Sequence, residues 1–384
     1  MMKKTVRIIH IAPFPFISGG IDTWLNNLLS SLNEDDVNIV IYCPSPIGKP
    51  NPVFQIQQLK NVEIIYIGTF NSYMTMLKWA WQVYKILRKE VIKTDTILAL
   101  STIPALIPIA LMRILTRFKG KVICSVRGNI AQDAIDLKKH KVFQIAVKYA
   151  EHLGLLFVDK IVANGWDTQK YLSNFYSLTS EVIPNGVATD YSARVSTLDN
   201  DINTIQILRD QGLKIILHVG TVRPIKGIDY IIEAFSLLPQ HLKENSALVF
   251  IGKGQIEHYQ IKSSALDIQP IFLGQKANVN DYYDLADLVI NVSGGSGVSN
   301  SLIEALMSGV PVLAWDNLTF SQVIKHGHNG LLAKHLNSDK LASILELYLK
   351  GNYSFSKSVI MCSVEKFEWS HIEVKWRTLL NIKG

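Results

Sequence analysis

Cysteine is scarce in this chain, and its placement excludes two common ways of stabilising a fold. The three cysteines, Cys43, Cys124 and Cys362, lie far apart in a sequence of 384 residues, and no two are closely spaced. Such a small and scattered set indicates neither a disulfide framework nor a structural zinc site. We therefore expect neither, and a reducing, cytoplasmic compartment fits this pattern.

A long uncharged hydrophobic run is also missing. The nearest candidate, TILALSTIPALIPIALM over 96–112, is interrupted by Ser101, Thr102 and two prolines. We interpret it as a strand followed by a helix start, not as a membrane-spanning helix. The opening MMKKTVRIIHIAP is basic, but a proline closes its apolar run too early for the core of a signal peptide.

Charged residues make up only 18% of the chain, and no segment combines low hydrophobicity with the high net charge that disorder requires. The net charge of +7 favours anionic partners, such as phosphorylated small molecules or acidic lipids. No run of lysine and arginine is interleaved with aromatic residues, so we expect no nucleic-acid partner.

Short valine, isoleucine and leucine runs alternate with helical segments, a pattern typical of parallel sheets covered by helices on both faces. The alternation lapses in the polar stretch from Pro184 to Gly212 and then resumes. We therefore expect an α/β protein of two doubly wound domains, over 1–184 and 213–354, joined by a linker over 185–212. A C-terminal helical segment follows over 355–384. The expected strands are 6–12, 37–43, 62–67, 96–100, 121–126, 160–163 and 181–183, then KIILHVG, LVFIGKG, PIFLG, LVINVSG and VPVLAW.

Two segments are predicted to be amphipathic helices. The stretch Tyr73–Lys93, YMTMLKWAWQVYKILRKEVIK, combines aromatic and basic residues. It fits an anionic membrane surface and, equally, an ordinary helix whose aromatics face the sheet. In the C-terminal segment the expected buried positions are Val359, Val364, Phe367, Trp369, Ile372, Trp376 and Leu379.

Ligands bind doubly wound sheets at the carboxyl ends of the strands, so two such domains are expected to enclose a cleft there. Three glycine-marked loops follow strands in the second half: HVGTVRPIKG over 218–227, IGKG over 251–254 and SGGSGVSN over 293–300. Glycine permits close backbone approach to a ligand, and a following helix start attracts phosphate. Arg223 and Lys226 of the first loop either bind such an anion or are solvated loop cations.

The first half offers weaker candidates. Ser18, Gly19 and Gly20 form a turn between a strand and a helix, which is also common in plain connectors. Arg127 follows the strand KVICSV, where it binds an anion or forms a structural salt bridge. His10 lies within a strand, and we interpret it as a packed core histidine.

Glu304 has two interpretations. The spacing Ser301-Leu-Ile-Glu304 fits a capping box, which would make the carboxylate structural. Alternatively, a carboxylate near a helix start beside a glycine loop accepts hydrogen bonds from sugar hydroxyls. The spacing alone does not separate the two.

Taken together, these motifs resemble the retaining GT-B glycosyltransferases of the family-four (glycosyl transferases group 1) type, over nearly the whole chain. The resemblance rests on SGGIDTWLNNLL, SVRGN, VIPNGV, VGTVRPIKGIDYIIEAF, VFIGKG, IFLG, GVSNSLIEALMSGVPVLAW and HGHNGLLA. It implies two Rossmann-like domains facing a central cleft, the first on the acceptor side and the second binding the donor. The C-terminal helix is expected to cross back to the first domain.

The resemblance also implies an activity. It is transfer of a sugar from a nucleotide-diphosphate sugar to a lipid-linked or glycan acceptor, with retention of the anomeric configuration. The expected setting is assembly of a bacterial-type surface polysaccharide, such as capsule, O-antigen or exopolysaccharide. We expect a cytoplasmic protein, peripheral on the inner face of the plasma membrane, with no cofactor and no metal.

Carried over residue by residue, the resemblance implies that Glu304 binds the ribose hydroxyls of the donor. Lys226 would neutralise the departing diphosphate, with Arg223 and Arg127 as further catalytic residues. The other implied site residues are Gly19, Gly20, Gly220, Thr221, Gly252, Gly254, Ser296, Gly297, Val298, Ser299, Asn300 and Ser301 at the donor, and Asn185 at the linker.

Three positions depart from the family pattern. Ser296 stands eight residues before Glu304, where a glutamate usually contacts the donor sugar, and Thr221 stands where an arginine usually follows the glycine. Arg127 replaces a frequent histidine, as in relatives with an arginine–glycine pair. These departures leave open a catalytically degenerate GT-B partner subunit. A nucleotide-sugar epimerase ranks third, because the sequence shows no matching set of carboxylates and histidines.

Overall fold

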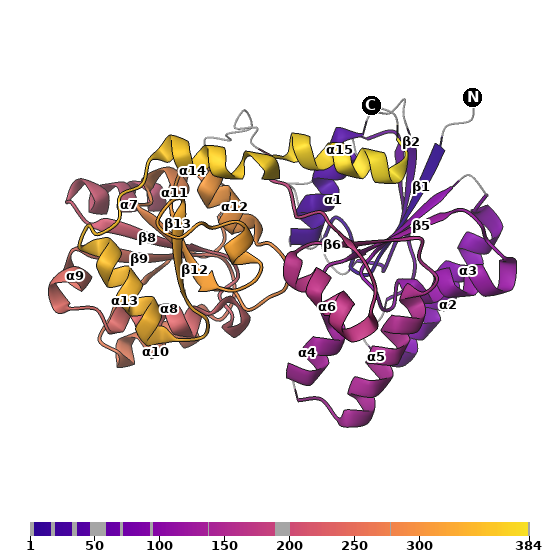
Figure 1. Ribbon diagram of the computed structural model, residues 1–384, viewed down its shortest axis with the longest axis horizontal. Helices are drawn as coiled ribbons and strands as arrows, with labels where there is room; N and C mark the ends of the chain where they lie inside the picture. The colour runs from indigo at the N-terminus through magenta and orange to yellow at the C-terminus, as the bar shows by residue number, and fades with distance from the viewer. Residues whose placement is uncertain are drawn as a thin grey trace. The chain divides into compact units, whose positions relative to one another are not determined.

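The computed structural model describes residues 4–16, 20–32, 37–46, 59–69, 72–92, 95–136, 138–188, 200–276 and 278–382. The chain divides into two compact units (Figure 1). Unit 1 comprises Met1–Gly186 together with Trp369–Gly384, and unit 2 comprises Val187–Glu368. Each is a parallel sheet with helices packed on it, and each is described by itself.

The described residues of unit 1 form a seven-stranded parallel sheet in the order β3-β2-β1-β4-β5-β6-β7. Its strands are β1 (Lys4–His10), β2 (Val37–Cys43), β3 (Val62–Tyr66), β4 (Thr96–Leu100), β5 (Lys121–Val126), β6 (Lys160–Ala163) and β7 (Glu181–Val182). Its helices are α1 (Gly20–Ser31), α2 (Tyr73–Glu90), α3 (Leu106–Thr116), α4 (Ile130–Asp136), α5 (Lys141–Leu155), α6 (Trp166–Tyr176) and α15 (Trp369–Leu380).

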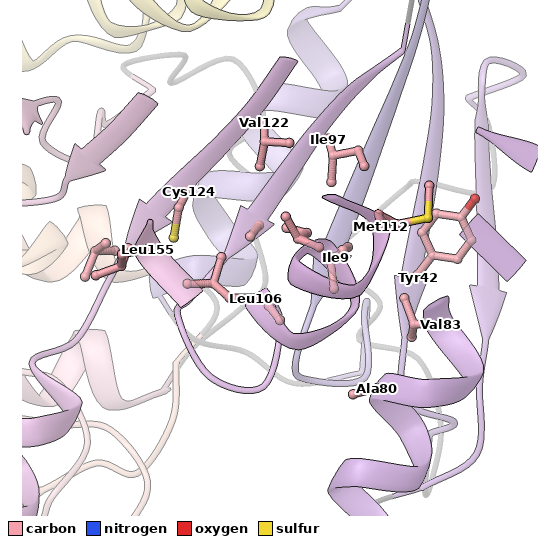
Figure 2. Packing of buried hydrophobic residues seen from close by; sticks show 14 of the residues in the cluster. Ile9, Tyr42, Ala80, Val83, Ile97, Leu106, Met112, Val122, Cys124 and Leu155 are labelled. Atoms are coloured by element: carbon pink, nitrogen blue, oxygen red, sulfur yellow. The ribbon is translucent and has the colours of Figure 1, made fainter. Parts of the chain in front are cut away.

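The central strands of unit 1, β2, β1, β4 and β5, bury both of their faces. Alternate side chains point to opposite faces of a strand, so in β1 Ile8 joins one hydrophobic cluster and Ile9 the other. The first cluster packs the sheet against α1 and α15, and the second packs it against helices that include α2 and α3 (Figure 2). This is why these strands are mostly apolar in the sequence instead of alternating strictly between apolar and polar residues.

The described residues of unit 2 form a six-stranded parallel sheet in the order β10-β9-β8-β11-β12-β13. Its strands are β8 (Lys214–Val219), β9 (Ser246–Ile251), β10 (Ile271–Phe272), β11 (Leu288–Asn291), β12 (Val312–Asp316) and β13 (Gly330–Lys334). Its helices are α7 (Asn200–Asp210), α8 (Ile228–Ser236), α9 (Gln240–Glu244), α10 (Ile256–Ala265), α11 (Val279–Leu285), α12 (Asn300–Met307), α13 (Ser338–Leu349) and α14 (Lys357–Val364), with short 3-10 turns η3 (Pro224–Lys226), η4 (Phe320–Gln322) and η5 (Glu365–Phe367).

Both strand orders have the doubly wound form, in which the chain reverses direction across the sheet between β1 and β4 and between β8 and β11. The predicted α/β architecture of two Rossmann-like domains is therefore confirmed. The C-terminal helix also returns to the first domain as expected. Trp376 of α15 packs edge-on against Trp24 of α1, with 4.8 Å between ring centroids, and Arg377 donates to the Ser31 carbonyl at 2.6 Å.

The structure differs from the sequence prediction in several details, among them the bounds of β1, which is Lys4–His10 where 6–12 was expected. The stretch expected as a linker contains α7, which buries Ile205 alone and so shows little apolar periodicity. The C-terminal segment divides after Glu368, with α14 in unit 2 and α15 in unit 1. In α14 the buried residues are Ile360 and the predicted Val364, while the predicted Val359 is 39% exposed. Within the described residues, no helix has the length and apolarity needed to cross a bilayer.

Candidate functional site

The three glycine-marked loops of unit 2 are neighbours at one edge of its sheet. They follow β8, β9 and β11, which are adjacent in the order β9-β8-β11, and parallel strands end at the same edge. The sequence placed the loops after strands; the pairing of those strands brings them together.

The loops after β8 and β9 touch through their backbones. Val222 N–H donates to the Lys253 carbonyl at 2.9 Å. A Cβ atom on Gly252 would lie 1.9 Å from the Gly220 carbonyl oxygen, and one on Gly254 would lie 2.2 Å from that of Val222. Both glycines also have positive φ angles, +145° and +150°. Only glycine permits this approach, so these two residues are fixed by packing as well as by any ligand.

The loops after β8 and β11 are also bonded to each other. Gly294 N–H donates to the Ile225 carbonyl at 2.8 Å, and the Lys226 ammonium lies 3.4 Å from Ser293 Oγ. A Cβ atom on Gly227 would lie 2.4 Å from the Val292 carbonyl oxygen. The 3-10 turn η3, which carries Lys226, is thereby fixed against the loop that leads into α12.

Two cations on this edge lack an opposite charge. Arg223 is exposed and Lys226 is half-buried, and neither forms an ion pair with any carboxylate among the described residues of the chain. Burial lowers the pKa of Lys226, and the nearby positive charge of Arg223 lowers it further. An anion bound here would relieve both effects, since an opposite charge stabilises the protonated amine.

The capping-box interpretation of Glu304 is wrong. Helix α12 begins at Asn300 with Ser299 as its N-cap, and no side chain caps it by hydrogen bonding. Glu304 therefore lies beyond the first turn, where its side chain does not reach the N-cap backbone. Its Oε2 accepts a hydrogen bond from the Tyr283 hydroxyl at 3.2 Å instead. Burial raises the pKa of Glu304, and the Tyr283 bond opposes part of that rise.

A buried asparagine shapes the loop in front of α12. Asn291, at the end of β11, donates through Nδ2 to Ser299 Oγ at 3.0 Å and to Ser301 Oγ at 3.1 Å. It therefore fixes where α12 starts, with Ser299 and Ser301 turned toward the end of β11. Ser296 is half-buried in the same loop, while Gly297 and Val298 are buried. Thr221, half-buried, follows Gly220 in the loop after β8.

The candidate residues of unit 1 are placed as follows. Gly20 is exposed at the first position of α1, whereas Gly19 lies outside the described residues. Arg127 follows β5, and its NH1 donates to Asn185 Oδ1 at 2.8 Å. The structural salt bridge considered for Arg127 is absent among the described residues. Instead its guanidinium stacks on the Trp24 ring at 3.9 Å from the centroid, and burial lowers its pKa to about 9.

Several residues of these edges were missed at the sequence level. His10 is buried as predicted, but it is bonded to a buried acid, Asp22 of α1, with 3.1 Å between Nε2 and Oδ1. Tyr283 and Asn291 also carried no signal, because each acts through a partner that only the folded path of the chain brings close. Among the described residues, no group of three or more metal-ligating side chains is placed to hold an ion.

Two family models match the chain. Residues 18–191 match Glycosyltransferase Family 4, and residues 199–360 match Glycosyl transferases group 1. An uncharacterised glycosyltransferase of Haemophilus influenzae is 27% identical over 142 residues, which cover 36% of this chain and 40% of the relative. The lipopolysaccharide glucosyltransferase WaaG of Escherichia coli is 25% identical over 175 residues, 43% of this chain and 45% of WaaG. The chain thus matches less than half the length of these curated relatives.

Solved structures share the fold over the whole chain. The crystal structure of Anabaena HepE in complex with UDP-glucose superposes with a TM-score of 0.74 at 18% identity, covering 98% of this chain and 99% of HepE. Together the two family matches run over both units, from residue 18 to residue 360. The chain belongs to the GT-B glycosyltransferases of the family-four, group 1 type.

Proposed function

We propose that the protein transfers a sugar from a nucleotide-diphosphate sugar to a lipid-linked or glycan acceptor, with retention of configuration, in surface-polysaccharide assembly. One observation carries the proposal. Three loops at the edge of the unit 2 sheet are joined by backbone hydrogen bonds. They place two cations without an ion-pair partner among the described residues, Arg223 and Lys226, next to the loop that leads into α12. WaaG, by its name a lipopolysaccharide glucosyltransferase, and HepE, crystallised with UDP-glucose, support this class of donor and product.

In this proposal the diphosphate lies at the start of α12. Helix N-termini bind phosphate through free backbone N–H groups and the helix dipole. The loop from Gly297 to Ser301 leads into that start, and no side chain caps it. Lys226 then neutralises the charge that develops as the nucleoside diphosphate leaves, and Arg223 assists. The reaction as proposed needs no metal, because these cations supply the positive charge.

Glu304 is proposed to bind the ribose. Tyr283 holds only Oε2 at 3.2 Å, so Oε1 has no hydrogen-bond partner among the described residues. A carboxylate with one oxygen anchored and the other open accepts a hydroxyl hydrogen bond in a fixed direction. This arrangement supports the role implied by the family resemblance over a purely structural one.

We also propose that unit 1 docks on an anionic membrane, where a lipid-linked acceptor would lie. Helix α2 buries Trp79 and Tyr84 but leaves Tyr73 and Trp81 66% and 44% exposed, so it is only partly a covering helix. Helix α5 exposes a second apolar stripe at a helical spacing, and Tyr73 contacts Phe143 at 5.6 Å between ring centroids. We call this surface the α2–α5 face; its exposed apolar residues are Tyr73, Met74, Leu77, Trp81, Val142, Ile145, Tyr149 and Leu153, and its basic residues are Lys78, Lys85, Arg88, Lys89, Lys139, Lys141 and Lys148.

Such a face matches the interfacial mode of membrane binding, in which apolar residues enter the bilayer and lysines meet acidic headgroups. Co-sedimentation with phosphatidylglycerol vesicles should retain the protein, and vesicles of phosphatidylcholine alone should not. Replacing Trp81 and Tyr149 with serine should reduce binding severalfold. Replacing Ile261, 73% exposed on α10 in unit 2, is the matched control and should change nothing. Equal binding by all variants would contradict this docking face.

Donor binding is tested by thermal unfolding with UDP, GDP, ADP and CDP sugars, because a ligand that binds only the folded state raises the melting temperature. One nucleotide should stabilise the protein, and Lys226→Ala should remove most of that shift. Lys340→Ala, an exposed lysine on α13, is the matched loss of charge and should keep it. A protein stabilised by no nucleotide would be the degenerate partner subunit that Ser296 and Thr221 leave open.

A further inference from the structure

A cation in unit 1, Arg127, is held in place by three side-chain contacts. Arg127 directly follows β5, at the carboxyl edge of the sheet. Its guanidinium lies 3.9 Å from the centroid of the buried Trp24 ring, Nε donates to Ser125 Oγ at 3.0 Å, and NH1 donates to Asn185 Oδ1 at 2.8 Å. Three elements, α1, β5 and the segment after β7, therefore fix the plane and direction of this side chain.

The contacts of Arg127 leave its charge unbalanced. Guanidinium carries five N–H donors, and the two bonds above use one on Nε and one on NH1. NH2 makes no hydrogen bond with any described residue, and all partners that are present are neutral. The nearest acid on α1, Asp22, is bonded to His10 instead. Burial without a carboxylate is also why the pKa of Arg127 falls to about 9.

Burying the charge of Arg127 without a counter-charge costs free energy unless a ligand supplies that counter-charge. Removing a charged group from water is unfavourable, and a buried arginine normally gains a carboxylate in return. Here the fold supplies a flat aromatic support and two neutral acceptors, which orient the guanidinium without neutralising it. NH2 keeps both of its N–H donors and NH1 keeps one, and a guanidinium with such donors left over suits an oxyanion that accepts two hydrogen bonds.

Arg127 differs in charge from the other described residues that directly follow strands of unit 1. Among the described residues that directly follow the strands of unit 1, no other is a lysine or an arginine. Gly128, the next residue, has no atom within 4 Å of where a Cβ would stand, so the backbone beside the guanidinium is uncrowded. A substrate that binds at this edge and carries a negative charge therefore meets one oriented cation.

We propose that Arg127, set by Trp24 and Asn185, binds an oxyanion of the acceptor, either a phosphate or the carboxylate of an acidic sugar. This rests on the proposed function, since the acceptor is defined by that reaction. It adds that the acceptor is anionic and that unit 1 recognises the anion through a single bidentate contact. A neutral glycan acceptor would leave Arg127 without the group it is oriented to receive.

The test measures Arg127 itself. The full-length protein is treated with phenylglyoxal, which modifies accessible arginines, and the modification rate of each arginine is followed by peptide mass mapping. UDP is present throughout, so that the cations of unit 2 are occupied. The probes are inorganic pyrophosphate, glucuronate and, as a neutral control, glucose at the same ionic strength. Arg113, already paired with Asp159 at 2.6 Å, is the internal reference.

We expect at least one oxyanion to slow modification of Arg127 fivefold or more, with no change from glucose and none at Arg113. Protection by pyrophosphate alone identifies a phosphate acceptor group, and protection by glucuronate alone identifies a carboxylate. Equal rates with all probes would overturn the inference. So would an Arg127 that phenylglyoxal does not modify in the free protein, because that side chain would be closed to a ligand.

The result is independent of the donor site. If UDP stabilises the protein but no oxyanion protects Arg127, the inference fails and the proposed function stands. If Arg127 is protected but no nucleotide stabilises the protein, the proposed function fails, and Arg127 is an anion site that serves no acceptor of that reaction. When an acceptor has been identified, Arg127→Gln should raise the KM for that acceptor at least tenfold and leave the KM for the donor unchanged. Arg127→Lys keeps the charge and should raise the acceptor KM less. If Arg127 were purely structural, Arg127→Gln would impair the binding of donor and acceptor together.

Discussion

Replacing Glu304 with glutamine separates donor binding from stability. In the folded protein the Glu304 carboxylate is desolvated, and only Oε2 is bonded, to the Tyr283 hydroxyl at 3.2 Å. Glutamine has nearly the same shape, and its amide oxygen accepts the same bond. Because burial penalises the ion, the neutral side chain should leave the melting temperature at pH 7 unchanged or higher.

The dependence on pH follows from the direction of the pKa shift. Burial raises the pKa of Glu304 above its ordinary value of 4.5. A raised carboxyl pKa stabilises the fold where the group is protonated, and that contribution is lost as the pH rises through the folded-state pKa. The melting temperature of Glu304→Gln should therefore exceed that of the natural protein by most at neutral pH. It should shrink as the pH falls toward 4.5.

The same change should cost binding. A hydrogen bond to a charged group contributes about 1.5 to 3 kcal/mol, so loss of one bond to a ribose hydroxyl should weaken UDP binding about 10- to 150-fold. Isothermal titration calorimetry with UDP measures this, beside thermal melts at pH 5 and pH 7. Tyr283→Phe is the control, since it frees the carboxylate but keeps its charge. A sharp fall in melting temperature with unchanged UDP affinity would refute the role of Glu304 in binding.

Three further predictions concern the fold. Gly252→Ala should lower the free energy of unfolding by about 2 to 4 kcal/mol, because its Cβ would meet a carbonyl oxygen at 1.9 Å, whereas Gly128→Ala should stay within about 0.5 kcal/mol; urea unfolding compares them. Arg7→Leu should cost about 3 to 5 kcal/mol in the same assay, since it leaves Asp95, whose side chain is 1% exposed, without its 2.7 Å partner. Cys362 should be the one thiol that reacts rapidly with Ellman's reagent in the native protein, because the other two cysteines are buried; a second fast thiol would contradict their burial.

The strands were predictable because they are buried on both faces. In β2 and β5 the predicted limits agree with the structure, since a mostly apolar run marks each strand. Helix α7 was not predicted, because it packs on the rest of unit 2 through a narrow strip that buries Ile205 alone. A polar helix held by an ion pair between Lys276 and Asp201 leaves almost no periodic signal in the sequence.

The site was predictable as a set of loops but not as a set of contacts. Glycine spacing located the three loops, and strand pairing then brought them together. The error at Glu304 shows the limit: Ser301 and Glu304 have the spacing of a capping box, yet the helix starts earlier. Asn291, eight residues before Ser299, bonds both Ser299 and Ser301 and so sets the start of the helix. Such a bond depends on the folded path of the loop and not on local spacing.

The charges that the fold leaves unbalanced are the ones best placed for a ligand. Lys226, Glu304 and Arg127 are each desolvated, and none has an ion-pair partner among the described residues. Elsewhere the chain pairs such groups closely, as at Arg7 and Asp95. A protein selected for stability alone would pair or remove the three, since an unpaired buried charge costs free energy. Their presence is expected if separate ligands complete them, a hydroxyl-bearing diphosphate at Lys226 and Glu304 and an oxyanion at Arg127, and stabilising substitutions at these positions should then reduce binding.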